Sequence, residues 1–199
     1  MNTATQTALH HFSRHPVLRT QDALTLGIHP RTLYALRDSG QIEQLSRGLF
    51  TLADSPPLAH PDLVIVAQRV PQAIIATISA AAFHDLTTQI PHAVHIVLPA
   101  FYSAPTLDFP PLELYRVSEP AYSAGVEEHM LDDVMVPIYG PEKTVADLLK
   151  FRSRVGLDVA MEALKRYLSR PDRNLDRLLH FARICRVAGV LRPYLEALV

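Results

Sequence analysis

Hydrophobic positions early in the chain predict two short helices joined by a tight turn. Leu26, Ile28, Leu33 and Leu36 are spaced so that both helices would bury one shared apolar seam. Gly27 lies between the two runs and suits the left-handed conformation that ends a helix. The polar residues of the second run would then point away from this seam.

The residues at the helix ends support the same prediction. Thr20 is a suitable N-cap for the first helix. Pro30 suits the first turn of the second helix, because its missing N–H needs no partner there. Gly40 ends that helix. We therefore predict a helix-turn-helix between Thr20 and Gly40.

A β-hairpin is predicted directly after the second helix. Two short β-rich segments, 41–46 and 49–52, flank Arg47 and Gly48, a pair suited to a tight turn. An opening helix is expected within residues 1–19. A helix-turn-helix followed by a hairpin is the order of a winged helix.

A winged helix is typical of DNA-binding proteins. One helix fits the major groove and its outward side chains reach base edges, while arginines and backbone N–H groups hold phosphates. Base contacts are expected from Arg31, Thr32 and Tyr34. Backbone contacts are expected from Thr20, Gln21, Arg37 and the hairpin-tip Arg47, which can also enter the minor groove. The alternatives are a winged helix that only docks to protein and a helical hairpin that matches the pattern by chance.

The remainder of the chain predicts a second, mixed domain. Residues 53–61 contain three prolines and are typical of a linker. A buried helix from Asp62, a short helix capped by Ser79 and a short terminal segment after Pro193 are expected. Strands are expected at 73–77, 92–98, 112–117, 128–131 and 134–139, with helices after residue 140. The predicted fold class is α+β, with a winged helix-turn-helix over 1–55 and a larger mixed α/β domain over 61–199.

Composition and charge restrict where nucleic acid would bind. The chain is 48% hydrophobic and 20% charged, as in globular proteins, and has neither a signal-peptide pattern nor a membrane-spanning run, so a cytoplasmic location is expected. The net charge of −1 is the sum of +2 over residues 1–52, −8 over 53–140 and +5 over 141–199. An acidic middle between basic ends predicts local binding, not coating of nucleic acid along the whole surface.

Neither a metal nor a cofactor is expected. The best candidate ligand set is His84, His92 and His95 with Asp132 and Asp133. The odd spacing of His92 and His95 in a strand would point these two side chains to opposite faces. The early histidines 10, 11 and 15 have no acid or cysteine nearby to complete a set. Cys185 is the only cysteine, which excludes an internal disulfide, and its apolar neighbours predict a core position.

Two catalytic patterns are incomplete, so no enzymatic activity is expected. Asp108 and Glu113 resemble the acidic pair of restriction-type nucleases, but Tyr115 stands where that pattern needs a lysine. The segment 140–144 opens a helix with a Lys-Thr pair. It lacks the glycines that allow a loop to cradle phosphates.

Basic residues gather at the junction of two late helices. Such a cluster could meet an acidic partner protein or nucleic acid, or could be a solvated helix face paired with the acidic middle segment. Its members are Lys165, Arg166, Arg170, Arg173 and Arg177.

Three segments together resemble the AbiEi-type antitoxins, which are predicted regulators of abortive-infection toxin–antitoxin operons. The segments are GIHPRTLYALRDSGQIEQLSRGLFTL, SAAAFHDL and YGPEKTVADLLKFRSRVGLDVAMEALKRYL. None contains a catalytic motif, so the resemblance is one of architecture. It implies DNA contacts for Arg31, Arg37 and Arg47, and an antitoxin surface that includes the helices of residues 141–168.

The resemblance also implies partners. In that family the N-terminal domain is understood to bind repeats in its own promoter, and the C-terminal domain to counteract a toxin resembling nucleotidyltransferases. We therefore expect an antitoxin that represses its own operon, binding as two copies to inverted repeats upstream of its gene. The toxin would be met directly or through its target. The alternative is a winged helix that docks to protein without sequence-specific DNA binding.

Overall fold

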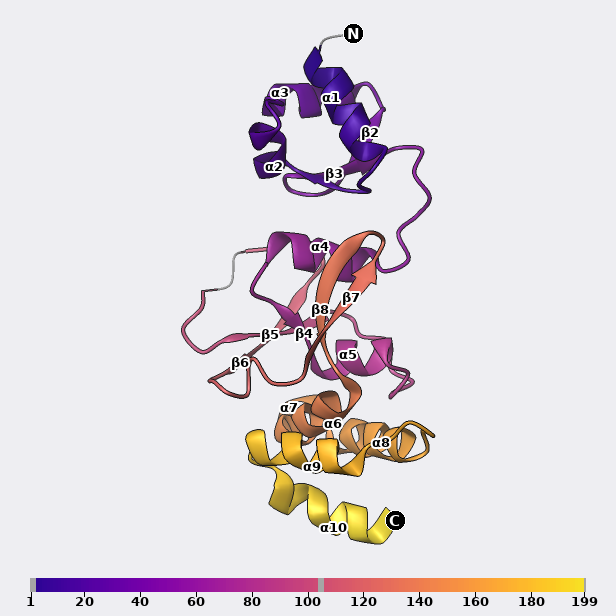
Figure 1. Cartoon of the computed structure of the whole chain (residues 1–199), viewed down its shortest axis with the longest axis vertical. Coiled ribbons are helices and arrows are strands. Elements are labelled where there is room, and N and C mark those ends of the chain that lie inside the picture. Colours follow the sequence, from indigo (N-terminus) through magenta and orange to yellow (C-terminus); the bar gives the residue numbers. More distant parts are fainter. Residues whose placement is uncertain (1–2, 104–105, 199) are drawn as a thin grey trace. The chain divides into compact units, whose positions relative to one another are not determined.

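The computed structural model describes residues 3–103 and 106–198 and divides them into two compact units. The N-terminal unit contains residues up to 71 together with 106–110 and 130–135, and the C-terminal unit contains the remainder. Each unit is built from helices and strands, as the α+β prediction required (Figure 1). Within the described residues, none of the helices is long and apolar enough to cross a membrane.

The N-terminal unit begins with the predicted winged helix. Its three strands form an antiparallel sheet in the order β1-β3-β2. The predicted hairpin is confirmed, and Ile42 pairs with Leu52 at its open end. The elements are α1 (Thr3–Phe12), β1 (Leu18–Arg19), α2 (Thr20–Thr25), α3 (Pro30–Asp38), β2 (Ile42–Ser46) and β3 (Leu49–Leu52).

The apolar seam between α2 and α3 forms with one change. Ile28, Leu33 and Leu36 are buried as predicted, but Leu26 is 44% exposed. Leu26 is the C-cap of α2 and is followed by left-handed Gly27, so the chain turns before the Leu26 side chain can reach the seam. Ala23 and Ile28 close the seam in its place, both 0% exposed.

Thr20 does not cap α2 as predicted. Arg19 is the N-cap, and Thr20 is the first helical residue. The reason is β1, a two-residue strand that pairs with β3 and runs directly into the helix. The Thr20 N–H donates to the Gly48 carbonyl at 2.9 Å, so the turn between β2 and β3, and not a side-chain cap, satisfies this N–H at the start of α2.

The second sheet has five strands in the order β6-β5-β4-β8-β7. β4 pairs antiparallel with β5 and parallel with β8, and β5 pairs parallel with β6. Asp132 and Asp133, both at positive φ, turn the chain between β7 and β8. The elements of this part are α4 (Pro61–Arg69), β4 (Ile74–Ile75), α5 (Thr77–Phe83), β5 (Val94–Pro99), β6 (Leu112–Val117), β7 (Val126–Leu131) and β8 (Val134–Tyr139).

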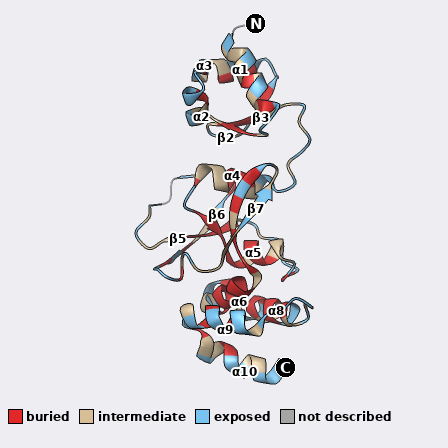
Figure 2. Cartoon of the chain, in the orientation of Figure 1, coloured by how far each residue is buried: buried red, intermediate tan, exposed pale blue. Residues whose placement is uncertain are grey.

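Helix α6 is the centre of the C-terminal unit. All its residues from Glu142 to Leu149 are buried (Figure 2), and it packs against α5, α8 and α9. The predicted core position of Cys185 is confirmed at 2% exposure. The C-terminal helices are α6 (Pro141–Lys150), α7 (Arg152–Val155), α8 (Leu157–Leu168), α9 (Leu175–Ile184) and α10 (Ala188–Leu198).

Two local predictions for the C-terminal unit were wrong. Ser79 lies inside α5, and its hydroxyl accepts from the His95 N–H at 2.9 Å, so it serves strand β5 and not the helix start. Pro193 lies within the 11-residue helix α10 and does not precede a short terminal segment. Leu191 is fully buried in the core, and this packing outweighs the one hydrogen bond that the proline removes.

Candidate DNA-binding surface

One face of α3 is free to meet a ligand. Leu33 and Leu36 face the core, whereas Arg31, Tyr34 and Asp38 are exposed at helical spacing. His29 caps the helix, since its Nδ1 accepts from the Arg31 N–H at 3.2 Å. The backbone around Arg31 is therefore fixed while its side chain stays exposed, which suits a residue that would reach a base.

Thr32 is less exposed than the other two predicted base contacts, Arg31 and Tyr34. Its side chain is half-buried, and its backbone N–H donates to the His29 carbonyl at 2.8 Å. Only part of this residue can reach a groove, so Arg31 and Tyr34 are the better placed pair.

Arg37 is held across Tyr34. Its guanidinium lies 5.1 Å from the centre of the Tyr34 ring and donates to Asp38 Oδ1 and to Gln44 Oε1. The Tyr34 ring packs edge-on against buried Phe50 at 6.1 Å between ring centres. A stacked, hydrogen-bonded arginine loses little side-chain freedom on binding a phosphate, but here it must share its charge with Asp38.

The wing is tied to the helices at its tip. Arg47 is exposed and Gly48 adopts a φ of +74°. The Gly48 carbonyl accepts from the Thr20 N–H, and the Arg47 carbonyl accepts from the Arg69 guanidinium. The wing turn is therefore held in place from two directions, and the Arg47 side chain projects from a fixed backbone.

A cavity of about 350 Å³ lies beside these groups within the N-terminal unit. Its walls include Thr20, Tyr34, Arg47 and Arg69, together with Asp108. Gln21 is exposed in the first turn of α2 and lines a neighbouring hollow that also includes Thr20 and Arg69. The predicted contacts Thr20, Gln21, Tyr34 and Arg47 thus lie around adjoining concave surfaces.

Arg69 is a candidate contact that the sequence pattern did not reveal. It is the last residue of α4, 22 positions after Arg47, whose carbonyl it binds. A basic residue in the last turn of a helix is ordinary, because it complements the helix dipole. Nothing in the local pattern therefore indicated its contact with the wing.

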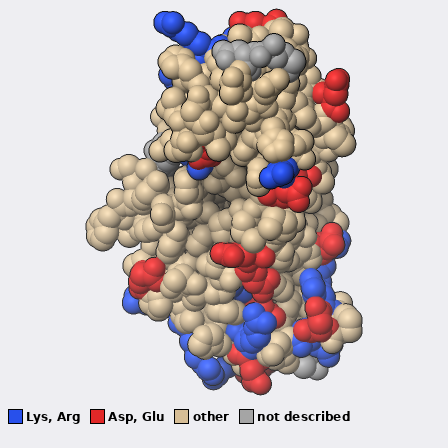
Figure 3. Space-filling view, turned by 45° about the horizontal axis from the view of Figure 1, so that its top comes forward, with Lys and Arg blue, Asp and Glu red and all other residues tan. Residues whose placement is uncertain are grey.

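The charge on this surface is local and mixed. On the face shown in Figure 3, both basic and acidic groups occur, with uncharged surface over much of the area between them. Arg19 is occupied by Asp22, whose two oxygens it binds at 2.6 and 2.8 Å. That contact raises the pKa of Arg19, which stays charged. Because the Asp22 carboxylate offsets this charge, the pair adds no free positive charge. Of the arginines predicted to contact DNA, Arg31 and Arg47 are exposed and have no carboxylate within ion-pair distance among the described residues.

The sequence of the winged helix matches the model of a known family. Residues 6–53 match the family model of AbiEi antitoxins, described as transcriptional regulators. The matched residues include α2, α3 and the wing. The match supports a role as a regulator in a toxin–antitoxin system, and the matched family is regulatory and not enzymatic.

The fold of nearly the whole chain is similar to a solved structure. The crystal structure of the Rv2827c protein from Mycobacterium tuberculosis aligns with a TM-score of 0.55 and 17% sequence identity, covering 95% of this chain and 79% of that one. At this identity the likeness concerns the fold alone. Among curated proteins, none matches the chain at a significant level.

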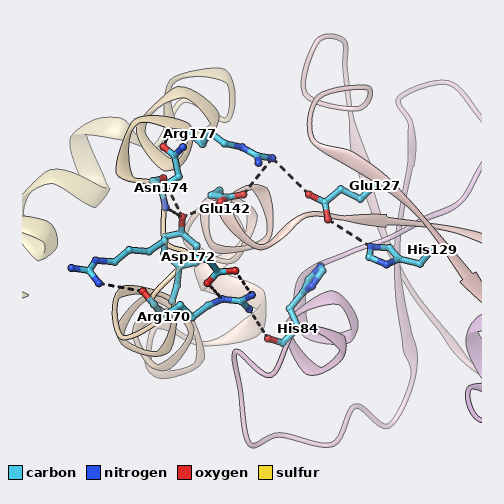
Figure 4. A network of polar contacts seen from close by, with 10 residues as sticks. His84, Glu127, His129, Glu142, Arg170, Asp172, Asn174 and Arg177 are labelled. Atoms are coloured by element: carbon cyan, nitrogen blue, oxygen red, sulfur yellow. Dashed lines mark hydrogen bonds and ion pairs between the residues drawn. The ribbon is translucent and has the colours of Figure 1, made fainter.

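The late basic cluster is divided by the structure into paired and open members. Arg166 pairs with Glu162. Arg170 pairs with Asp172, and Arg177 with both Glu127 and Glu142 (Figure 4). Within the described ranges, Lys165 and Arg173 have no carboxylate within ion-pair distance, and both are exposed. The cluster therefore presents fewer free charges than its sequence suggests.

Proposed function

We propose that this protein is a DNA-binding autorepressor of its own toxin–antitoxin operon. The α3 face would read bases through Arg31 and Tyr34, and Arg37, Arg47, Thr20 and Gln21 would hold phosphates. Two copies would bind an inverted repeat upstream of the gene. The division into a DNA-binding domain over 1–55 and an antitoxin domain over 61–199 belongs to the same proposal.

The observation that carries this proposal is the exposed face of α3 beside a fixed wing. Arg31 and Arg47 are both exposed while the backbone at each is held by hydrogen bonds. Preorganised donors bind phosphates and bases at a lower entropic cost than mobile side chains. The family match over residues 6–53 covers these same elements.

The experiment is a titration of the purified chain against the DNA immediately upstream of its own gene, with random DNA as the control. At about 150 mM salt we expect at least a tenfold preference for the upstream fragment, about 1.4 kcal/mol. Equal affinity for the two DNAs, or no binding, would contradict the repressor proposal.

Salt dependence separates this proposal from the protein-docking alternative. Five or six phosphate contacts should make the affinity fall steeply between about 50 and 200 mM salt, because bound counterions are released. An affinity that does not change with salt would favour a winged helix that docks to protein.

We further propose that the C-terminal domain counteracts the paired toxin, a protein resembling nucleotidyltransferases, either directly or through its target. The helices of 141–168 and the late basic cluster would form the surface. Lys165 and Arg173 are the members free to meet an acidic partner, whereas Arg170 and Arg177 hold the unit together.

Charge reversal of the two open members tests this surface. Lys165→Glu combined with Arg173→Glu should abolish rescue of growth when the protein is expressed together with its toxin, because both changes repel an acidic partner. Arg183→Glu with Arg192→Glu is the matched control, since both arginines are exposed and lie outside the cluster. Rescue by the first variant at the level of the control would remove the cluster from the partner surface.

A further inference from the structure

Three potential metal ligands meet in the C-terminal unit, in a set that differs from the one considered from the sequence. One ring nitrogen each of His84 and His129 and one carboxylate oxygen of Glu127 all lie within 4.8 Å of one another. In Figure 4 the three side chains point toward one another. His129 Nε2 and Glu127 Oε2 are 3.6 Å apart.

The fold brings the set together from two elements. Glu127 and His129 are two positions apart on β7, so both project from the same face of the strand. His84 is the C-cap of α5, and Phe83 beside it packs against the His129 ring at 4.8 Å between ring centres. A Cβ at Gly140 would collide with Glu127 Oε1, so this glycine leaves the room that the carboxylate occupies.

The tautomer of His84 is fixed by a hydrogen bond to the backbone. Its Nε2 lies 2.8 Å from the Tyr139 carbonyl, and a carbonyl can only accept, so Nε2 carries the proton. In the neutral ring this leaves the lone pair on Nδ1. Histidine ligands commonly donate their other N–H to a backbone carbonyl, which fixes the tautomer and the ring orientation.

His129 supplies a second indication of a missing partner. Its Nε2 is buried and has no hydrogen-bond partner among the described residues. A buried imidazole nitrogen without a partner costs free energy, because it has lost water and gained nothing in exchange. A metal ion would satisfy this nitrogen.

The charges around the set allow a cation. Arg170 donates to the His84 carbonyl and pairs with Asp172, and Arg177 lies 3.6 Å from Glu127 Oε1 and from Glu142 Oε2. Three carboxylates thus stand against two guanidiniums, and Arg177 uses only one oxygen of Glu127. The other oxygen, Oε2, faces His129.

We propose that His84, Glu127 and His129 bind one divalent zinc-like ion that joins α5 to β7. Two imidazoles and one carboxylate suit Zn²⁺, with the fourth tetrahedral position left to water, whereas Mg²⁺ prefers oxygen ligands. Tetrahedral ligands at zinc distances are roughly 3.3 Å apart. The atoms of the set all lie within 4.8 Å of one another, so ion binding would require them to move closer together.

The test is a calorimetric titration of the full chain with Zn²⁺. The starting variant carries His11→Gln and His15→Gln, because those two rings lie 4.7 Å apart and could bind an ion themselves. We expect one Zn²⁺ per chain, and a loss of affinity of at least tenfold on adding Glu127→Gln or His129→Gln. Glu128→Gln is the matched control, since Glu128 is exposed between the two ligands, and it should change the affinity less than twofold.

A second measurement does not depend on the folding of the ligand variants. Co²⁺ added to the starting variant should give the intense visible absorption of a four- or five-coordinate ion. Absorption as weak as that of hydrated Co²⁺ would overturn the proposal, as would Zn²⁺ binding that Glu127→Gln and His129→Gln leave unchanged. The set shares no residue with α3 or the wing, so its failure would leave the DNA-binding proposal intact.

Discussion

Replacing Arg31 by alanine is expected to weaken binding to the upstream DNA by about 1 to 3 kcal/mol while leaving binding to random DNA nearly unchanged. The reason is that a side chain contacting a base edge contributes only where the right base is present. Arg31 is exposed, and its backbone N–H is held by His29, so the change removes a contact without disturbing the helix start. Fluorescence anisotropy with both DNAs at one salt concentration measures the difference.

Arg47→Ala and Asp38→Asn are the comparison variants. Arg47→Ala should weaken binding to both DNAs equally, because a wing arginine on a phosphate reads no sequence. It should also lower the slope of log affinity against log salt concentration by about one. Asp38→Asn should strengthen binding to both DNAs, since it removes the negative charge that pairs with Arg37. Equal losses on the two DNAs for Arg31→Ala would exclude Arg31 from base reading.

The largest expected effect on stability comes from Lys143, which is fully buried in α6. Its Nζ lies 2.5 Å from Asp147 Oδ2 and 3.7 Å from the centre of the Tyr139 ring. Cys185 Sγ donates to the other oxygen of Asp147 at 3.2 Å. Lys143→Met should lower the free energy of unfolding by about 3 to 5 kcal/mol, because it leaves a buried carboxylate without a counter-ion. Urea unfolding should show a lower midpoint at an unchanged slope.

Two further variants distinguish the ion pair from loss of packing. Lys150→Met changes a half-buried lysine of the same helix and should cost no more than about 1 kcal/mol. Adding Asp147→Leu to Lys143→Met should recover most of the loss, since no buried charge is then left. A double variant as unstable as Lys143→Met alone would show that the unpaired Asp147 charge does not cause the loss of stability.

The cysteine in this group, Cys185, is expected to be unreactive. Burial, followed by the nearby Asp147 charge, raises the pKa of Cys185 to about 12, so the thiol stays protonated at neutral pH. A protonated thiol can donate to Asp147 Oδ1, as it does here. This agrees with the core position predicted from its apolar neighbours.

Local patterns predicted the elements that are long or bounded by strong signals. The strands 112–117 and 134–139 and the wing hairpin lie where β-rich runs and turn residues placed them. Pro30 opens α3 as predicted. Strand β1 was missed because two residues are too few to show the alternation of apolar and polar positions that marks a strand. It is a strand only because it pairs with Phe50 and Leu49. Leu26 was misplaced because periodicity does not show where a turn begins.

The contacts that matter for the candidate sites depend on tertiary structure. Alternation on β7 does place Glu127 and His129 on one face, but nothing in the sequence brings His84 to them. The burial of Lys143 is equally hidden, because its spacing from Asp147 is that of an ordinary surface pair. Arg69 reaches the wing only after the linker has folded back.

In the proposed DNA-binding role, the tethered wing turn would also limit which DNA shapes the protein can accept. Thr20 and Arg69 bind the two carbonyls of the turn, so the distance from the wing arginine to the exposed face of α3 is set before DNA arrives. A rigid spacing of this kind would measure the interval between the major groove and the adjacent phosphates. Sequences whose backbone already has this spacing would fit without deformation, and base pairs that the protein never touches would thereby contribute to its preference.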